Sequence, residues 1–116
     1  MSYSGCIFCK IADKKIPARI IYEDEDALAF EDINPRAPVH ALIIPKRHIA
    51  NTLDITEEDN HIVGHLIQIA NRIASDKGIA ERGFRLVINC NPEAGQTVYH
   101  LHIHVLGGRI MHWPPG

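Results

Sequence analysis

The chain is poor in cysteine, in aromatic side chains and in charge of one sign. Its three cysteines are too few, and odd in number, for a disulfide framework. Twelve basic and 14 acidic residues leave a formal charge of -2, which does not suggest a protein that coats a nucleic-acid polymer. No hydrophobic run approaches the roughly 20 residues of a membrane span, and residues 1–5 lack the regions of a signal peptide. We therefore expect a cytoplasmic protein that binds neither membranes nor nucleic-acid polymers.

The rest of the composition is that of an ordinary folded domain with an excess of histidine. The 116 residues are 46% hydrophobic and 22% charged, which is enough for a modest core, and we expect one domain over residues 1–116. Eight histidines and one tryptophan are the unusual features of the composition.

Residues 99–106 alternate histidine with branched apolar side chains, the pattern of a β-strand with one buried face. Because successive side chains of a strand point to opposite faces, His100, His102 and His104 are predicted to share one face, and the apolar residues between them the other. Neighbouring rings would lie roughly 6.5–7 Å apart. The plainer alternative is a solvated strand face that happens to carry histidines.

The other elements are predicted from short patterns along the chain. Strands are expected over residues 18–23, 27–32, 41–45 and 84–89, where β-branched and aromatic residues gather. A short helix is expected near residues 6–11, and a long one of about 20 residues from Thr56, a good N-cap, to a stop at Lys77 and Gly78. His61 and His65 lie one turn apart on the long helix and are predicted to be surface residues.

Two loops carry candidate site residues. Residues 33–38 contain two prolines, which stiffen the loop and make it a platform for Asp32 on one side and His40 on the other. Asp32 has a plainer reading as a turn residue. Residues 90–97 are rich in turn formers and could offer backbone N–H groups and the Thr97 hydroxyl to an anion, although an ordinary hairpin connection explains them equally well.

Cys6 and Cys9 have the Cys-x-x-Cys spacing that lets two thiolates reach one metal ion. By itself this spacing also fits a redox pair or two inert buried thiols. A metal site needs two further ligands, and His48 and His100 are candidates that only the fold could bring close.

Three kinds of chemistry fit the histidine run. The rings could bind a metal, attack phosphorus as neutral nucleophiles, or hold an anion in a protein that is not an enzyme. The sequence lacks a strong carboxylate cluster, which argues against a Mg²⁺-dependent phosphoryl transfer site. This favours a metal-free mechanism with a covalent histidine intermediate.

The motifs together resemble the histidine triad family. Residues 100–106 have its alternation of histidine and apolar side chains, and four further segments fall in the family's order along the whole chain, namely residues 6–11, 32–40, 95–99 and 107–116. The ending is similar to that of the branch of histidine triad nucleotide-binding proteins, the purine nucleoside phosphoramidases.

The resemblance implies hydrolysis of an adenosine or guanosine 5′-phosphoramidate to the nucleoside monophosphate and an amine, without a required cofactor. His102 would attack the α-phosphorus to form a nucleotidyl-histidine, and His104 would hydrogen-bond the phosphate. His100 and His40 would support the nucleophile or relay protons, and Asp32 would hold the ribose hydroxyls. The other implied contacts are a purine slot of Ile7, Phe8, Phe30 and Ile33, and phosphate contacts from Asn89, Gly95, Thr97 and Val98. At the Thr97 position the family usually has serine.

Two alternatives remain beside this activity. The chain could be a purine nucleotide-binding or scaffold protein without turnover, or a dinucleoside polyphosphate hydrolase of the same family.

The resemblance also implies an α+β fold with a five-stranded antiparallel sheet, one long helix and one short helix. Two chains would form a homodimer with a continuous ten-stranded sheet. The tail, residues 107–116, would reach the partner's site, where Trp113 would help to select the leaving group.

Finally, the resemblance implies a structural zinc site. Cys6, Cys9, His48 and His100 match the zinc-binding members of the family, whereas many phosphoramidase members lack the cysteines. With zinc bound, His100 would be a ligand and not a relay.

Overall fold

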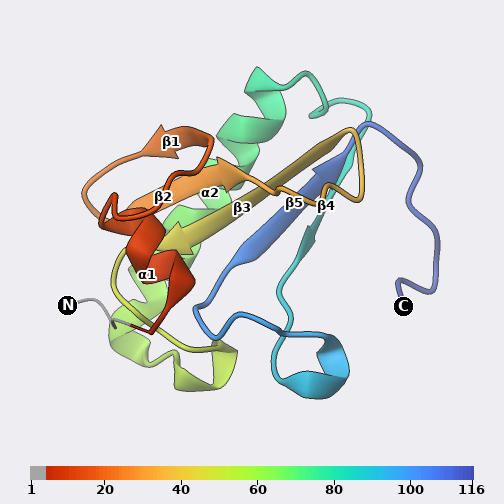
Figure 1. Ribbon diagram of the computed structural model, residues 1–116. Helices are drawn as coiled ribbons and strands as arrows, with labels where there is room; N and C mark the ends of the chain where they lie inside the picture. The colour runs from red at the N-terminus through yellow and green to blue at the C-terminus, as the bar shows by residue number, and fades with distance from the viewer. Residues whose placement is uncertain (1–4) are drawn as a thin grey trace.

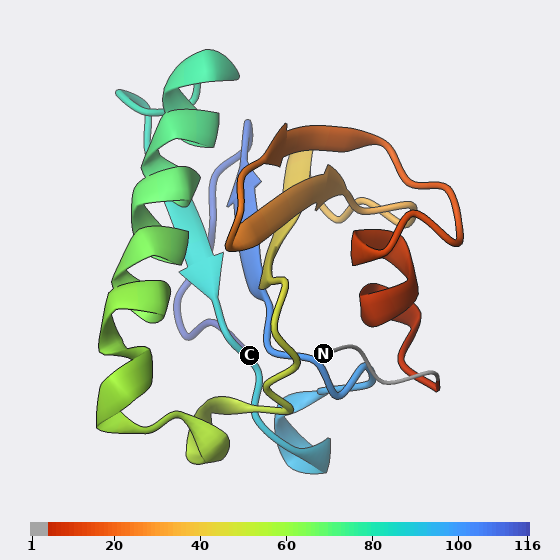
Figure 2. The same cartoon turned by 90° about the vertical axis from the view of Figure 1, so that its left-hand side faces the viewer.

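The computed structural model describes residues 5–116, which form one antiparallel sheet with a helix on each face (Figures 1 and 2). The strand order is β1-β2-β3-β5-β4. The strands are β1 (Ile20–Glu23), β2 (Ala27–Glu31), β3 (Val39–Pro45), β4 (Phe84–Val87) and β5 (Ile103–Gly107), and the helices are α1 (Ile7–Ala12) and α2 (Asn60–Asp76). Short 3-10 turns cover Thr52–Asp54, Glu57–Asp59 and Pro92–Ala94. The predicted α+β fold, with one long and one short helix, is confirmed.

Strands β2 and β3 are buried on both faces, which explains their apolar sequences. On β3, Ala41 and Ile43 belong to the core under α2, whereas Leu42 and Ile44 belong to the core under α1. The β2 strand divides in the same way, with alanines toward α2 and the larger Leu28 and Phe30 toward α1. The sheet is therefore shared by two cores, and the smaller one, under α1, lies beside the candidate site.

The long helix ends where the sequence predicts and begins slightly later. Thr56 and Asp59 form a capping box: the backbone N–H of Thr56 donates to the Asp59 carboxylate over 2.9 Å. The box caps a 3-10 turn, and α2 itself starts at Asn60. At the other end, Lys77 is the C-cap and Gly78 has a positive φ of 75°.

The prediction that one strand carries all three histidines is wrong. β5 starts at Ile103, so that only His104 lies on it, and residues 98–102 approach it as a loop. The backbone N–H of Leu101 donates to the carbonyl of Ile49 rather than to a neighbouring strand. The predicted division into two sides still holds, because Leu101 is buried in the core under α2 while the ring of His102 faces α1.

The other strands differ from their predicted bounds at the ends. β1 begins two residues later than predicted and β4 ends two residues earlier, while β3 begins two residues earlier. Turn residues and loop hydrogen bonds set these limits, and a hydrophobic pattern does not encode them.

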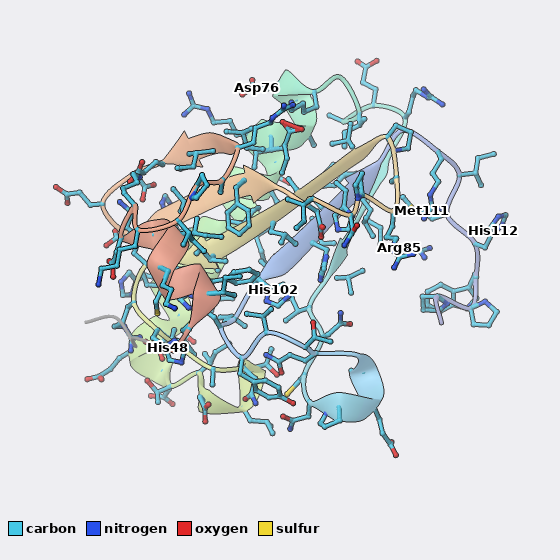
Figure 3. The ribbon with its side chains drawn as sticks, viewed as in Figure 1. His48, Asp76, Arg85, His102, Met111 and His112 are labelled. Carbon is cyan, nitrogen blue, oxygen red and sulfur yellow. The ribbon has the colours of Figure 1, made fainter. Side chains whose placement is uncertain are left out.

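The C-terminal tail leaves the sheet after β5 and runs away from it (Figures 1 and 3). Arg85 donates to the carbonyl of His112 over 3.0 Å, which fixes part of the tail's path. Trp113 is 81% exposed within the chain, so the packing partner predicted for this side chain does not come from its own described residues.

None of the helices in residues 5–116 is both long and apolar enough to cross a membrane. The prediction that residues 1–5 are not a signal peptide stays untested, because residues 1–4 lie outside the described residues. The cytoplasmic location stays a prediction.

Candidate active site

A cavity of about 380 Å³ lies between α1, β2 and residues 98–102, which we call the histidine loop. Nine of the predicted site residues line it: Ile7, Phe8, Phe30, Asp32, Ile33, Thr97, Val98, His102 and His104. The fold adds others that the sequence did not indicate, among them Ile11, Ile16, Pro17, Ala18, Asn34 and Leu42. One end of the cavity is therefore apolar and the other carries imidazoles.

The apolar end is built by two phenylalanines that contact each other edge to face. The ring centroids of Phe8 and Phe30 are 5.3 Å apart at an interplanar angle of 75°. Phe8 also lies 5.2 Å from the ring of His102. Ile33 is 93% exposed and lies at the rim. A flat aromatic ligand could fill such a slot without offering a hydrogen bond.

Hydrogen bonding determines which nitrogen of His102 carries the proton. Its Nδ1 lies 2.7 Å from the carbonyl oxygen of His100. A carbonyl only accepts, so Nδ1 is the donor and Nε2 keeps its lone pair. Burial lowers the pKa of His102, which keeps the ring neutral at physiological pH. His102, which is labelled in Figure 3, is thus a neutral imidazole with a nucleophilic Nε2, and it lines the cavity.

His104 has the opposite arrangement, set by a chain of three groups. The backbone N–H of Arg36 donates to Nδ1 of His40 over 3.0 Å, so that His40 must carry its proton on Nε2. That Nε2 lies 2.9 Å from Nδ1 of His104 and donates to it. Nε2 of His104 therefore carries a proton. Burial is the main cause that lowers the pKa of His104 to about 4.

Two adjacent imidazoles of opposite tautomer result. The ring centroids of His102 and His104 are 5.0 Å apart, closer than the prediction for alternating strand residues, because His102 precedes β5. One ring presents a lone pair and the other an N–H donor. This pair can attack an electrophilic centre and at the same time hydrogen-bond an oxygen attached to it.

Asp32 makes the turn contact that was considered from the sequence, and it also lines the cavity. Its Oδ1 accepts the backbone N–H of Asn34 over 2.8 Å, which is an Asx-turn contact. Its Oδ2 lies 3.4 Å from Nε2 of His40, and the residue also lines the cavity.

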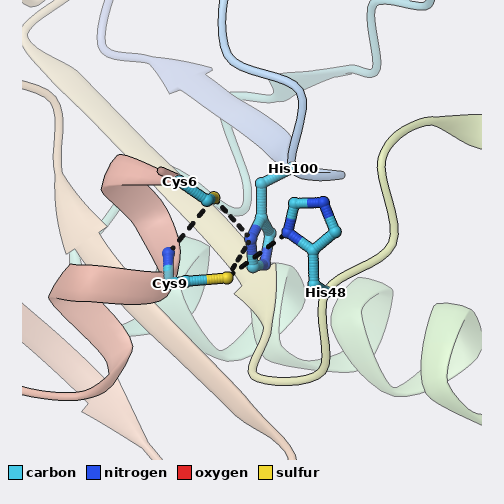
Figure 4. Close-up of side chains that lie close together, drawn as sticks. All are labelled: Cys6, Cys9, His48 and His100. Atoms are coloured by element: carbon cyan, nitrogen blue, oxygen red, sulfur yellow. Dashed lines mark hydrogen bonds between the residues drawn. The ribbon is translucent and has the colours of Figure 1, made fainter. Parts of the chain in front are cut away.

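The two cysteines meet His48 and His100 in one cluster (Figure 4). Sγ of Cys6 and Nδ1 of His100 are 3.3 Å apart, as are Sγ of Cys9 and Nδ1 of His48, and all four candidate ligand atoms lie within 4.8 Å of one another. Tetrahedral zinc, with bonds of about 2.3 Å to sulfur and 2.0 Å to nitrogen, places such atoms about 3.5 Å apart. The donor set and its spacing therefore fit zinc.

The far side of His100 supports the same assignment. Its Nε2 lies 2.7 Å from the carbonyl of Pro45 and donates to it, which leaves the Nδ1 lone pair directed at the cysteines. The side chain has no exposed surface, and burial lowers its pKa to about 4. His100 therefore lies behind the cavity and does not line it.

A second group, formed by Asp32, His40 and His104, has similar spacing but a different chemistry. Nδ1 of His40 already accepts the backbone N–H of Arg36. Its Nε2 must then carry a proton, which blocks the lone pair that a metal would need. We interpret this group as a hydrogen-bond chain.

Five of the predicted catalytic and substrate-binding residues do not line the cavity: His40, Asn89, Gly95, His100 and Trp113. His40 and His100 lie behind the cavity and contact two residues that do line it, His104 and His102 respectively. Gly95 has a positive φ of 89° and ends the 3-10 turn after Asn91, so its evident role is to shape the loop.

Sequence reasoning missed Gln96, which holds this loop in place. Its side chain is buried and donates to the carbonyls of Ala50 and Val98 over 2.8 and 3.2 Å, while its oxygen accepts the N–H of Asn91. An amide within a turn-rich loop gives no local signal of its contact with Ala50, which lies 46 residues away in the sequence.

The sheet, the slot under α1 and the histidine pair define a small α+β protein with a histidine-lined ligand cavity. A model of the HIT domain family matches residues 13–111, and the chain belongs to this family. An uncharacterized HIT-like protein of Synechococcus elongatus is 56% identical over 110 residues, which are 95% of this chain and 96% of that protein.

Solved structures agree with this membership. A HIT family hydrolase from Legionella pneumophila superimposes with a TM-score of 0.95 at 50% identity, covering 97% of this chain and 100% of that one. A histidine triad protein from Clostridium difficile gives 0.93 at 45% identity, covering 97% of each chain. The protein thus has the fold of HIT family hydrolases.

Proposed function

We propose that the protein hydrolyses purine nucleoside 5′-phosphoramidates to the nucleoside monophosphate and an amine. The observation that carries this proposal is the pair of opposite tautomers at His102 and His104, in a cavity that Phe8 and Phe30 also line. The structural relative from Legionella pneumophila is named a HIT family hydrolase, which agrees with a hydrolytic reaction.

The reaction proceeds in two displacements at one phosphorus atom. Nε2 of His102 attacks the α-phosphorus and the P–N bond to the amine breaks. The amine nitrogen takes a proton from solvent as it leaves, and the water that attacks in the second displacement returns one to solvent. Nδ1–H of His102 still donates to the carbonyl of His100, which stabilises the positive charge that develops on the ring. Water then attacks the nucleotidyl-histidine, releases the monophosphate and restores the neutral ring.

His104 stabilises the charge that gathers on the phosphoryl oxygens. Its Nε2–H is aimed by the chain from Arg36 through His40, so the donor is in place before the substrate arrives. Asp32 accepts from the ribose hydroxyls, and Phe8 and Phe30 enclose the base. We propose that no divalent cation takes part, since the two rings supply both the nucleophile and the donor, and that added Mg²⁺ leaves the rate unchanged.

We also propose a structural zinc ion on Cys6, Cys9, His48 and His100, on the donor set described above. When bound, zinc supplies a cross-link between α1, the loop after β3 and the histidine loop.

A homodimer with a ten-stranded sheet is proposed as well, since β4 leaves one edge of the sheet unpaired among the described residues.

The decisive test is to trap the covalent intermediate. The protein is mixed with adenosine phosphoramidate and denatured without acid, and its intact mass is measured by mass spectrometry. We expect an adenylyl adduct on the wild type and on His61→Ala, an exposed control on α2, and none on His102→Gly. Binding of AMP without turnover or adduct would favour the nucleotide-binding alternative, and faster cleavage of dinucleoside polyphosphates would favour the other hydrolase.

A further inference from the structure

The short helix α1 carries both a wall of the cavity and half of the cysteine–histidine cluster. It has six residues, too few for a helix that is stable by itself, so its position depends on what it contacts. Phe8 faces the cavity and the neighbouring Cys9 faces the cluster. Cys6 is the N-cap, and its Sγ accepts the N–H of Cys9 over 3.3 Å (Figure 4).

The other half of the cluster belongs to the segment that holds the nucleophile. His100 offers its ring to the cysteines and its backbone carbonyl to His102. The ring of Phe8 lies 6.0 Å from that of His100 and 5.2 Å from that of His102. The cluster and the apolar slot are thus two sides of one contact between α1 and the histidine loop.

We propose that a Zn²⁺ ion on Cys6, Cys9, His48 and His100 ties α1 to the histidine loop and thereby sets the affinity of the cavity for the nucleotide base. This inference rests on the proposed function. It assigns the four ligands a positioning role, exerted through Phe8, in addition to stabilising the fold.

Two of the four cluster residues, Cys6 and His48, are only partly buried. Cys6 and His48 line a second hollow of about 390 Å³, which shares Ile7, Thr97 and Val98 with the first cavity. A chelator can therefore reach the ligands without global unfolding of the chain.

Loss of the ion should affect binding more than chemistry. Without it, α1 is held by Phe8, Ile11 and weak thiol–imidazole contacts, and the slot loosens. His100 keeps its bond to Pro45, and His102 keeps its bond to the His100 carbonyl, so the nucleophile stays aligned. The Kd of AMP and the KM should then rise about tenfold, while kcat changes by less than about threefold.

The experiment compares the full chain loaded with Zn²⁺, stripped by chelator, and reloaded, together with Cys9→Ser. Cys90→Ser is the matched control, because this third cysteine is not among the four cluster residues. AMP affinity is measured by calorimetry, and hydrogen–deuterium exchange is followed in residues 7–12 and in α2. We expect stripping to weaken AMP binding and speed exchange in residues 7–12 but not in α2, with reversal on reloading.

Three results overturn the inference, and they differ from failure of the proposed function. They are a purified protein that takes up no Zn²⁺, equal AMP affinity in the loaded and stripped states, and equal exchange of residues 7–12 in both. Failure of the loaded protein to bind AMP would instead remove the proposed function, and the affinity inference with it. Should Cys9→Ser fail to fold, the stripping and reloading of the wild type decide the matter.

Discussion

At the scale of single residues, two backbone groups decide what the histidines can do. The carbonyl of His100 places a proton on Nδ1 of His102, and the N–H of Arg36, through His40, places one on Nε2 of His104. Identical side chains thus become an acceptor and a donor. Neither assignment needs a charged ring.

His104 supplies one such donor, and its removal tests the role. His104→Ala should lower kcat about 10²–10³-fold, as the loss of a preorganised donor to a developing oxyanion does. The Kd of AMP should change far less, because the base slot is intact. Steady-state kinetics and calorimetry measure the two effects. A variant with normal kcat would contradict the assignment.

The low pKa of His104 makes stability depend on pH with a definite sign. The unfolded ring gains a proton near pH 6.5, whereas burial delays protonation in the folded chain until pH is about 4. The unfolded state therefore binds more protons between these values, and the free energy of unfolding falls as pH falls from 6.5 toward 4. Urea unfolding at several pH values should show a shallower fall for His104→Asn than for the wild type. An identical slope would refute the shifted pKa.

At the scale of elements, the end of β5 depends on a close approach of two loops. Gly108 has a φ of 89°, and a Cβ added there would lie 2.9 Å from Cβ of Pro38. The glycine therefore lets the tail leave the sheet beside the proline-containing loop, residues 33–38, that precedes His40. Gly64, on the exposed side of α2, has no such neighbour within 4 Å.

Alanine at these two glycines should change stability in opposite directions. Gly108→Ala should lower the free energy of unfolding by about 1–2 kcal/mol, since the left-handed region is unfavourable for a residue with Cβ. Gly64→Ala should raise it by up to about 1 kcal/mol, because alanine is the better helix former. Urea denaturation measures both. Equal effects in the two variants would show that backbone conformation is not the cause.

At the scale of the whole molecule, β4 and the tail are surfaces of the described residues where a partner could bind. The free edge of β4 offers unpaired backbone groups, and Trp113 is 81% exposed. Both suit a second copy of the chain. Among the residues described, Arg85 on β4 also anchors the tail, so the edge and the tail form one region.

A dimer through this region has a direct test. Light scattering at micromolar concentration should give twice the 13.0 kDa mass of one chain. Trp113→Ala should leave the dimer intact and change kcat/KM for bulky amine leaving groups more than for ammonia. A monomeric mass would exclude the dimer, and an equal change for all leaving groups would exclude a selective role of Trp113.

The sheet, the long helix and the residue types of the site could be predicted from local patterns in the sequence. Strand and helix periods, the caps at Thr56 and Gly78, and the alternation around His102 are local properties, so they can be read without knowing the fold. The alternation also separated the histidines from the apolar side correctly, although it placed the start of β5 too early.

The different environments of the three histidines could not be predicted from such patterns, because they depend on contacts between distant segments. His100 donates to Pro45 and faces Cys6, and His104 accepts from His40, over separations of 55, 94 and 64 residues. Such contacts depend on how strands and loops pack, which no local pattern encodes. Proton positions follow from these partners, so the chemistry of three similar rings became distinct only once the chain was folded.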